Sequence, residues 1–265
     1  MRKALLIMLA AIAFASTANA GSSQWTKTPG GAVRLIVEEP AAGARAVRGA
    51  LQINLDPGWK TYWREPGDAG VPPELDLSQS ANIAGHELSF PAPHRFKDGA
   101  SHWAGYKKPV FLPVSITLAD TSRPAHIKGH AFLGICETVC IPVTAEFDVA
   151  VGGQKSDPLT DTLVDTAFQQ LPAPASDAFG ISSGRKKGDV LYLTVKLPSQ
   201  DPAIDLFAAG QSGITLGMAH LKKREGAEAT FAVPVLSGKD RPAGVLDYTL
   251  VQGQEAVSGH ISIED

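Results

Sequence analysis

The chain has 265 residues, of which 44% are hydrophobic and 19% charged, and its 24 basic and 27 acidic side chains give a formal net charge of −3. This mildly acidic balance argues against a nucleic-acid-binding protein, whose binding surface is normally basic. The length, together with 26 glycines and 19 prolines, predicts two β-rich domains of roughly 100–150 residues each.

The first 20 residues have the composition of a secretory signal peptide. Arg2 and Lys3 precede an apolar run, and Ala18 and Ala20 form an A-x-A cleavage site. No later segment approaches the roughly 20 apolar residues that a transmembrane helix needs. We therefore expect export into an oxidising compartment, where a disulfide persists, and no transmembrane segment after cleavage.

Alternating apolar and polar residues predict strands in the first half of the chain, at 32–38, 46–55 and 110–118. Residues 56–73 between them are dense in aromatic residues, Gly and Pro, and proline lacks the donor that a central strand needs. Trp59 and Trp63 are interpreted as core anchors of a long irregular loop. A ligand or partner surface is the alternative interpretation of this segment.

The spacing of apolar residues changes after residue 156. Asp157 followed by Pro158 is typical of a helix N-terminus, and apolar residues then recur at helical spacing as far as Leu171. We expect a short amphipathic helix and a linker that ends at residue 176. Four further alternating runs predict a second β domain without cysteine or tryptophan, at 190–197, 230–235, 245–251 and 256–263.

The predicted organisation is thus all-β, with two β-sandwich domains joined by a short helix and linker. The expected boundaries are 1–20 for the signal peptide, 21–153 for the first domain, 154–176 for the helix and linker, and 177–265 for the second domain. The sequence of the second domain indicates no chemistry of its own. Its expected roles are packing, spacing or partner contact.

The two cysteines, Cys136 and Cys140, are separated by three residues and join two alternating runs, 126–135 and 141–151. This pattern predicts a β-hairpin whose loop the cysteines flank. Directly opposed Cα atoms in such a hairpin lie about 4.5–5.5 Å apart, within the roughly 4.4–6.8 Å that a disulfide needs. Both cysteines fall on the polar side of their strands, so both sulfurs are expected at the surface.

The residues around the pair leave three interpretations open. A bridge that closes about five residues stabilises a fold by only about 2 kcal/mol, which favours a redox-active pair over a structural disulfide. Two thiolates also suit Cu(I) or zinc, and Cys136 and Cys140 would then be the copper ligands. The histidines are interpreted as surface residues, and no cofactor is expected. Glu137, with no basic residue between the sulfurs, favours a moderate or reducing exchange protein over a strong oxidant.

Several motifs occur in a fixed order over about residues 30–150: PGWKTYWREPGD at 57–68, FPAPHRF at 90–96, Gly105-Tyr106, LPV at 112–114, and the cysteine pair. In these motifs the chain resembles the N-terminal periplasmic domain of DsbD-type thiol:disulfide interchange proteins, and more closely the related domain of ScsB-type proteins. The region that follows is similar to the ScsB-type proteins in strand pattern, more weakly.

The resemblance implies that both sandwich domains have an immunoglobulin-like fold and that the protein is periplasmic. It implies that Cys136 and Cys140 are the redox pair of a protein-disulfide reductase component. This pair would take electrons from a thioredoxin-like redox protein or a membrane electron transporter and pass them to oxidised periplasmic client proteins. In the family an aromatic-tipped loop caps the disulfide. Residues 98–106 correspond to that loop here, with His102, Trp103 and Tyr106 as the cap candidates.

The sequence departs from the full-length family proteins in two respects. It contains no polytopic membrane region and no thioredoxin-like domain with its own Cys-x-x-Cys, so we expect a free-standing carrier or adaptor. Its cysteines are also closer together than those of the best-known DsbD domain. A periplasmic Cu(I)-binding or copper-tolerance protein, and an interaction module with an inert disulfide, are the alternative functions.

Overall fold

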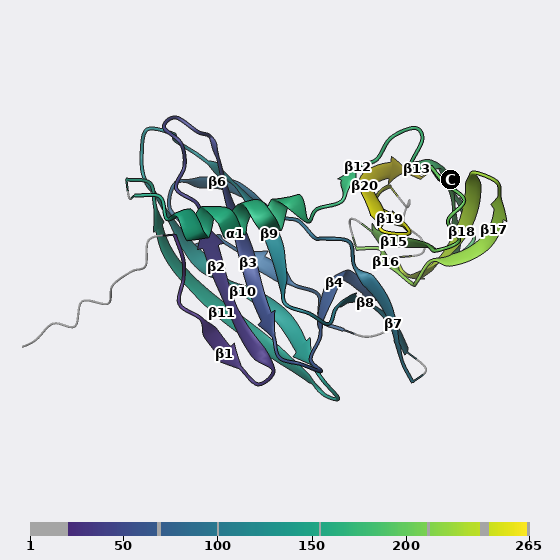
Figure 1. Cartoon of the computed structure of the whole chain (residues 1–265), viewed down its shortest axis with the longest axis horizontal. Helices are drawn as coiled ribbons and strands as arrows, with labels where there is room; N and C mark the ends of the chain where they lie inside the picture. The colour runs from purple at the N-terminus through teal and green to yellow at the C-terminus, as the bar shows by residue number, and fades with distance from the viewer. Residues whose placement is uncertain are drawn as a thin grey trace, which may run out of the picture.

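The computed structural model describes residues 21–67, 70–99, 101–153, 155–210, 213–238 and 244–263. Within these ranges the chain forms strands β1 to β20 and one helix, α1. The strands form two β-sandwiches that lie at opposite ends of the molecule, with α1 leading from the first towards the second (Figure 1). The predicted signal peptide lies outside the described residues.

The first sandwich packs two antiparallel sheets around one core. The larger sheet has the order β1-β2-β3-β9-β6 and consists of Thr26–Thr28, Gly31–Val37, Ala46–Leu55, Val110–Leu118 and Ile83–Leu88, respectively. The smaller has the order β11-β10-β5 and consists of Cys140–Val151, Ala125–Cys136 and Glu74–Asp76. Alternate side chains of both sheets are fully buried between them, among them Leu35, Leu51, Leu112, Ile127 and Leu133.

A third, small sheet lies at the end of the first sandwich that faces the second (Figure 1). It has the order β4-β8-β7, with the bounds Thr61–Gly67, Ser101–Tyr106 and His94–Asp98. We call it the cap sheet. Part of the segment expected to be irregular is therefore strand β4. The interpretation of Trp63 as a core anchor is confirmed, since its side chain is 2% exposed, and Trp59 packs against the same core.

The predicted cysteine hairpin is confirmed along its whole length. Strands β10 and β11 pair in continuous register from Ala125 opposite Val151 to Cys136 opposite Cys140. The apolar side chains alternate as the sequence predicts, and Ile127 and Val149, which oppose each other, are both buried. The hairpin therefore carries the cysteines away from the body of the core to one end of the sandwich.

Helix α1, Pro158–Gln169, is confirmed, and its N-cap is Asp157, whose carboxylate accepts a hydrogen bond from the amide of Leu159. Rather than serving only as a connector, the helix covers the outer face of the larger sheet. Its Val164 and Ala167 are buried against Ile36 and Ala50 in β2 and β3. Apolar contacts therefore attach the helix to the first sandwich, while the division of the chain at 154–176 stays a prediction.

The second sandwich consists of two further sheets around a separate core. One has the order β12-β20-β19-β15, which are Ala173–Pro174, Glu255–Ser262, Val245–Gln252 and Ile204–Gly210. The other has the order β13-β14-β18-β16, with β17 also paired to β18; these are Gly180–Lys187, Val190–Lys196, Glu228–Ser237, Thr215–Leu216 and His220–Glu225. Leu193, Leu206, Phe231 and Leu250 lie at the centre of this core.

The predicted fold class, all-β with two sandwiches, is confirmed. The four strands predicted in the second half correspond to β14, β18, β19 and β20, whereas β12, β13, β15, β16 and β17 were not predicted. No helix in the described ranges is long and apolar enough to cross a membrane.

Candidate redox site

A disulfide joins Cys136 to Cys140 at the tip of the β10–β11 hairpin, with their Cα atoms 4.1 Å apart. The two cysteines are the last pair of the ladder, and residues 137–139 form the exposed turn beyond them. Val139 in this turn is 72% exposed although it is apolar. The bridge thus lies where the hairpin ends and another molecule can approach.

The two halves of the disulfide differ in their exposure. Cys140 is exposed, as the strand pattern predicts, but Cys136 is only 1% exposed, and the prediction of a surface position for it is wrong. The backbone of Lys60 pairs with Cys136 through two hydrogen bonds, of 2.8 and 2.9 Å. The segment that enters β4 therefore lies beside Cys136 at the edge of β10.

Three aromatic side chains from the three strands of the cap sheet lie against the disulfide, and we call them the aromatic layer: Tyr62, Phe96 and Trp103. Tyr62 and Trp103 form a cluster with Cys136, against which Phe96 packs. Phe96 stacks on Trp103 with ring centroids 4.3 Å apart, and Tyr62 meets Trp103 edge-on at 5.5 Å. The layer keeps water from the Cys136 side of the bridge.

The hydroxyl of Tyr62 lies 3.3 Å from Cys140 Sγ. Since a disulfide sulfur carries no hydrogen, the hydroxyl is the donor in this contact. Burial, with a smaller contribution from the Asp98 carboxylate, raises the pKa of Tyr62. The hydroxyl therefore keeps its proton at neutral pH and can donate a hydrogen bond to a sulfur that becomes a thiolate.

A charged group holds the aromatic layer at its edge. Asp98 accepts a hydrogen bond of 2.9 Å from Trp103 Nε1 and forms an ion pair with Lys60. The hydrogen bond from Lys60 is the main cause that lowers the pKa of Asp98. The ammonium groups of Lys60 and Lys107 lie 4.8 Å and 5.4 Å from the Trp103 ring centroid, within the range of a cation–π contact. Two lysine ammonium groups therefore lie over the Trp103 ring of the aromatic layer.

The three cap candidates lie in different places. Trp103 is part of the aromatic layer. His102 directly precedes Trp103 on β8 and opposes Lys97. Because successive strand residues point to opposite faces, His102 lies on the face of the cap sheet opposite to Trp103. Tyr106 is buried in the main core, where its hydroxyl donates to the Pro91 carbonyl at 2.8 Å. The capping role itself stays a prediction for all three.

Sequence reasoning did not single out Tyr62, Phe96, Asp98, Lys60 or Lys107 as site residues. Tyr62 and Lys60 lie within the PGWKTYWREPGD motif and Phe96 ends the FPAPHRF motif, so the motifs contained a signal for three of them. Their position at the disulfide depends on the pairing of β4 with β8, which joins segments about 40 residues apart in sequence.

No group of three or more His, Cys, Asp or Glu side chains that could hold a metal ion occurs in the described ranges. The copper alternative would therefore depend on the reduced Cys136 and Cys140 thiolates alone among these residues.

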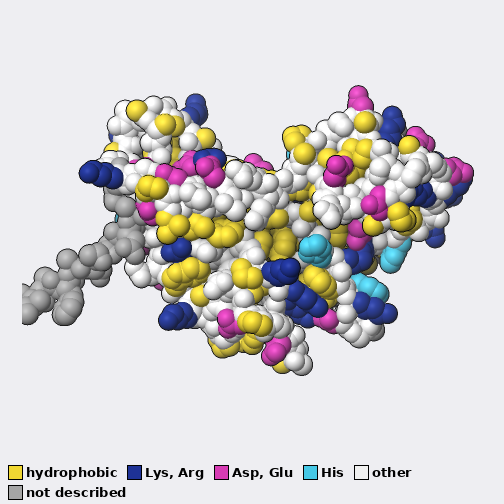
Figure 2. Space-filling model, viewed as in Figure 1, with side chains coloured by type: hydrophobic (Ala, Val, Ile, Leu, Met, Phe, Trp, Pro, Cys, Tyr) yellow, Lys and Arg dark blue, Asp and Glu magenta, His cyan; other side chains and the backbone are white. Residues whose placement is uncertain are grey.

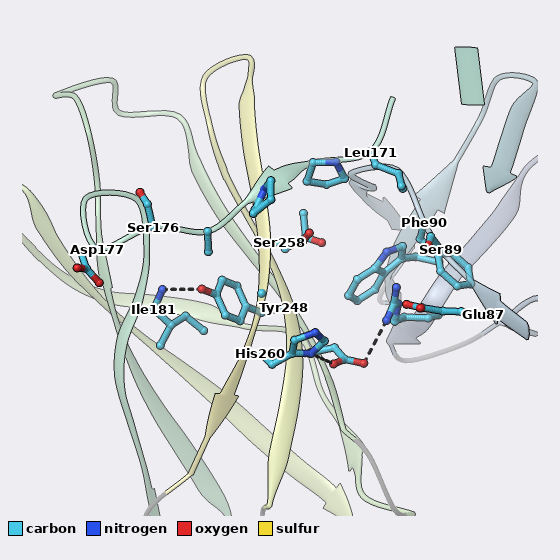
Figure 3. A pocket seen from close by; sticks show the side chains of 18 residues that line it. Glu87, Ser89, Phe90, Leu171, Ser176, Asp177, Ile181, Tyr248, Ser258 and His260 are labelled. Atoms are coloured by element: carbon cyan, nitrogen blue, oxygen red, sulfur yellow. Dashed lines mark hydrogen bonds and ion pairs between the residues drawn. The ribbon is translucent and has the colours of Figure 1, made fainter. Parts of the chain in front are cut away.

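A cavity of about 560 Å³ lies between the two sandwiches. The space-filling view shows the molecule as two lobes with a hollow between them (Figure 2). Phe90 lines the cavity from the first sandwich, and Tyr248 and His260 line it from the second (Figure 3). His260 Nδ1 contacts the Asp247 carboxylate at 2.5 Å, which also accepts a hydrogen bond from Arg64. Neither cysteine lines this cavity.

The fold and the site together define a class: a β-sandwich protein with a hairpin disulfide, one sulfur exposed and the other covered by aromatic side chains. Residues 32–151 match the family described as "Thiol:disulfide interchange protein DsbD, N-terminal". The matched residues include both cysteines and the whole aromatic layer. The resemblance stated from the motifs is therefore confirmed for residues 32–151, which match the N-terminal domain family of DsbD-type interchange proteins.

Among solved structures, the chain is similar to the N-terminal periplasmic domain of ScsB from Proteus mirabilis, with a TM-score of 0.74 and 22% identity over 93% of this chain and 100% of that one. At this identity the likeness concerns the fold, and it extends over both sandwiches. Titin Ig tandem domains A164-A165 also match, at 11% identity over 83% of this chain and 88% of that one, with a TM-score of only 0.21. No curated protein matches the sequence.

Proposed function

We propose that the protein is a periplasmic thiol:disulfide interchange protein whose Cys136–Cys140 pair carries electrons from a thioredoxin-like donor, or a membrane electron transporter, to oxidised client proteins. The observation that carries the proposal is the asymmetry of the bridge. Cys140 is exposed beside a tyrosine hydroxyl, while Cys136 is buried under aromatic rings. An exchange protein needs one sulfur that a partner reaches and one that stays within the site.

The exchange proceeds in two steps. A thiolate of the reduced donor attacks Cys140 Sγ, the bond between the two sulfurs breaks, and Cys136 leaves as a thiolate that takes up a proton. The second donor thiol then attacks the mixed disulfide and releases Cys140. The donor is oxidised to a disulfide, and the pair now holds two electrons and two protons. Attack by reduced Cys140 on a client disulfide, followed by attack of Cys136 on Cys140, reverses these steps and reduces the client.

The neighbouring side chains support this division of roles. The Tyr62 hydroxyl can stabilise negative charge on Cys140 Sγ as a partner sulfur joins or leaves. The aromatic layer excludes water from Cys136, so it restricts the attack of unrelated thiols from that side. The exposed Val139 beside Cys140 gives a partner an apolar contact close to the reacting sulfur.

Two observations support the periplasm as the compartment. Residues 1–20 have the pattern of a secretory signal peptide, and the similar ScsB structure is described as a periplasmic domain. A bridge at an exposed hairpin tip also needs an oxidising compartment in order to persist.

The reduction potential of the Cys136–Cys140 pair tests the proposal. The mature protein is equilibrated in thiol redox buffers, and the fraction of free thiol is measured by the mass added on alkylation. A potential between roughly −270 and −120 mV, the range of thioredoxin-like exchange proteins, is expected. A potential below about −300 mV, where structural disulfides lie, would show that the bridge is inert.

A further inference from the structure

The cap sheet has two occupied faces, and they belong to different parts of the molecule. Residues that oppose each other on paired strands share a face. Phe96 opposes Trp103, and both lie on the disulfide side with Tyr62. Arg95 opposes Ala104 on the other side. Gly105 opposes Tyr62, and a Cβ at this position would collide with the Thr61 carbonyl oxygen, so β4 and β8 approach closely here.

The second sandwich holds the side of the cap sheet that faces away from the disulfide. Arg95 of β7 makes a two-pronged contact with Asp205 of β15, with Nε 2.8 Å from Oδ2 and Nη2 2.5 Å from Oδ1. The same guanidinium donates to the carbonyl of Leu206 at 3.2 Å. Planar, two-pronged contacts between arginine and a carboxylate fix orientation as well as distance. Asp205 therefore fixes the position of β7 at the residue directly before Phe96.

Strand β4 is held in the same way. Trp63, directly after Tyr62, meets Phe207 of β15 edge-on with ring centroids 5.9 Å apart. Arg64 donates to Asp247 of β19 at 3.1 Å. Phe207, Ala209 and Met218 of the second sandwich also belong to the core cluster of the first. Each residue of the aromatic layer on β4 and β7 thus has a chain neighbour that contacts the second sandwich.

We infer that the second sandwich positions the aromatic layer over the disulfide, with Asp205, through Arg95, as the positioning residue. Because the aromatic layer and these contacts are made by adjacent residues on the same strands, the contacts with the second sandwich restrict movement of the layer away from Cys136. Release of the second sandwich from β7 allows the β7–β8 hairpin to move and admits water to Cys136. This inference deepens the proposed function, on which its biological meaning rests.

The consequence for reactivity follows from the leaving group. When an external thiolate attacks Cys140, Cys136 leaves as an anion into apolar surroundings, and burial disfavours a charged thiolate. Water that enters when the aromatic layer moves lowers this cost. A variant that loosens the layer should therefore be reduced faster, even though Cys140 is exposed in both proteins.

The test is the rate at which the disulfide is reduced by dithiothreitol, which supplies both electrons and both protons and closes to its own cyclic disulfide. The oxidised mature protein is mixed with excess reagent, samples are quenched by alkylation, and the mass shift is followed over time. We expect D205N to be reduced about fivefold faster than the parent protein, since one charge-assisted contact is lost. D205E, which retains a carboxylate for Arg95, should stay within about twofold of the parent.

Two further variants make the result decisive. R95Q breaks the same contact from the first sandwich and should be reduced as fast as D205N, and it keeps the test available if D205N folds poorly. D165N removes a charged contact of similar length, 2.8 Å between Arg48 and Asp165, that lies on α1 away from the cap sheet, and it should leave the rate unchanged. Equal rates for the parent, D205N and R95Q would overturn the inference, as would an equal acceleration by D165N.

The outcome is independent of the proposed function, since dithiothreitol needs no protein docking surface. If D205N accelerates reduction but the parent protein exchanges with no thioredoxin-like protein, the positioning role stands and the proposed function fails. If the parent exchanges normally and D205N has no effect, the proposed function stands and the positioning role fails.

Discussion

The Tyr62 hydroxyl donates to Cys140 Sγ at 3.3 Å, while the ring of the same tyrosine packs in the cluster that buries Cys136. One side chain therefore contacts both halves of the bridge, with its polar end on the exposed sulfur and its apolar face on the covered side. This relationship makes the two cysteines chemically unequal, and the first two predictions below depend on it.

The first prediction concerns which cysteine forms the bond with a partner. In C136S the exposed Cys140 thiol remains without its neighbour. Its thiolate should displace thionitrobenzoate from a single-cysteine thioredoxin-like protein that carries this leaving group as a mixed disulfide, and the adduct should accumulate because neither protein holds a second thiol to break it. In C140S the remaining Cys136 is buried, and little adduct is expected. Non-reducing gel electrophoresis after incubation with a thioredoxin-like protein measures the adduct. Similar adduct yields from the two variants would contradict the assignment of Cys140 as the attacked sulfur.

The second prediction concerns the tyrosine hydroxyl. In Y62F the reduced Cys140 thiolate loses a hydrogen-bond donor worth about 1 kcal/mol, so alkylation of Cys140 by iodoacetamide at pH 7 should slow about fivefold. Y106F is the matched control, because its hydroxyl donates to the Pro91 carbonyl in the main core. Its alkylation rate should equal that of the parent. An equal slowing in both variants would show that the effect is not specific to the contact with sulfur.

The third prediction concerns Asp98, which holds Trp103 and Lys60 at the edge of the aromatic layer. The carboxylate is largely exposed, so D98N should cost less than about 1 kcal/mol of unfolding free energy. It should nevertheless accelerate reduction by dithiothreitol, because Trp103 loses a charged acceptor. D148N, which removes the exposed carboxylate that contacts His126 on the β10–β11 hairpin, should change neither the stability nor the reduction rate. A large loss of stability in D98N with an unchanged reduction rate would contradict the prediction.

The fourth prediction concerns pH and Glu65. Burial raises the pKa of Glu65 to about 7 from its ordinary value of 4.5, against a smaller opposing effect of the Leu216 amide. The unfolded chain therefore loses this proton at lower pH than the folded one, and the charged form disfavours the folded state. The contribution of Glu65 to stability should fall as the pH rises from about 4.5 to 7 and remain low above it.

The measurement is urea unfolding of the parent protein and of E65Q between pH 4.5 and 8. Since E65Q does not titrate at this position, its stability relative to the parent should increase with pH across this range. Leu216 belongs to β16 of the second sandwich, so the same series reports on the contact between the two sandwiches. A difference between the two proteins that does not change with pH would exclude the raised pKa.

Local sequence patterns determined much of the fold. The alternation around the cysteines predicted the hairpin and its opposed pair, because a strand with one buried face must repeat every two residues. Asp157-Pro158 and the helical spacing after it predicted α1 for an equally local reason. The strands that were missed lack this signal: β13 is mostly polar, and β15 is an apolar run that makes contact on both sides.

Tertiary structure decided the chemistry of the site. The strand pattern placed both sulfurs at the surface, since it describes one strand and its faces and not what covers them. Cys136 is buried because the Lys60 backbone pairs beside it and the aromatic layer of the cap sheet packs on it, and these contacts come from segments 33 to 76 residues upstream. The sequence by itself thus determined that two cysteines oppose each other at a hairpin tip. Only long-range packing made one of them accessible and the other covered, because burial depends on which distant segments meet.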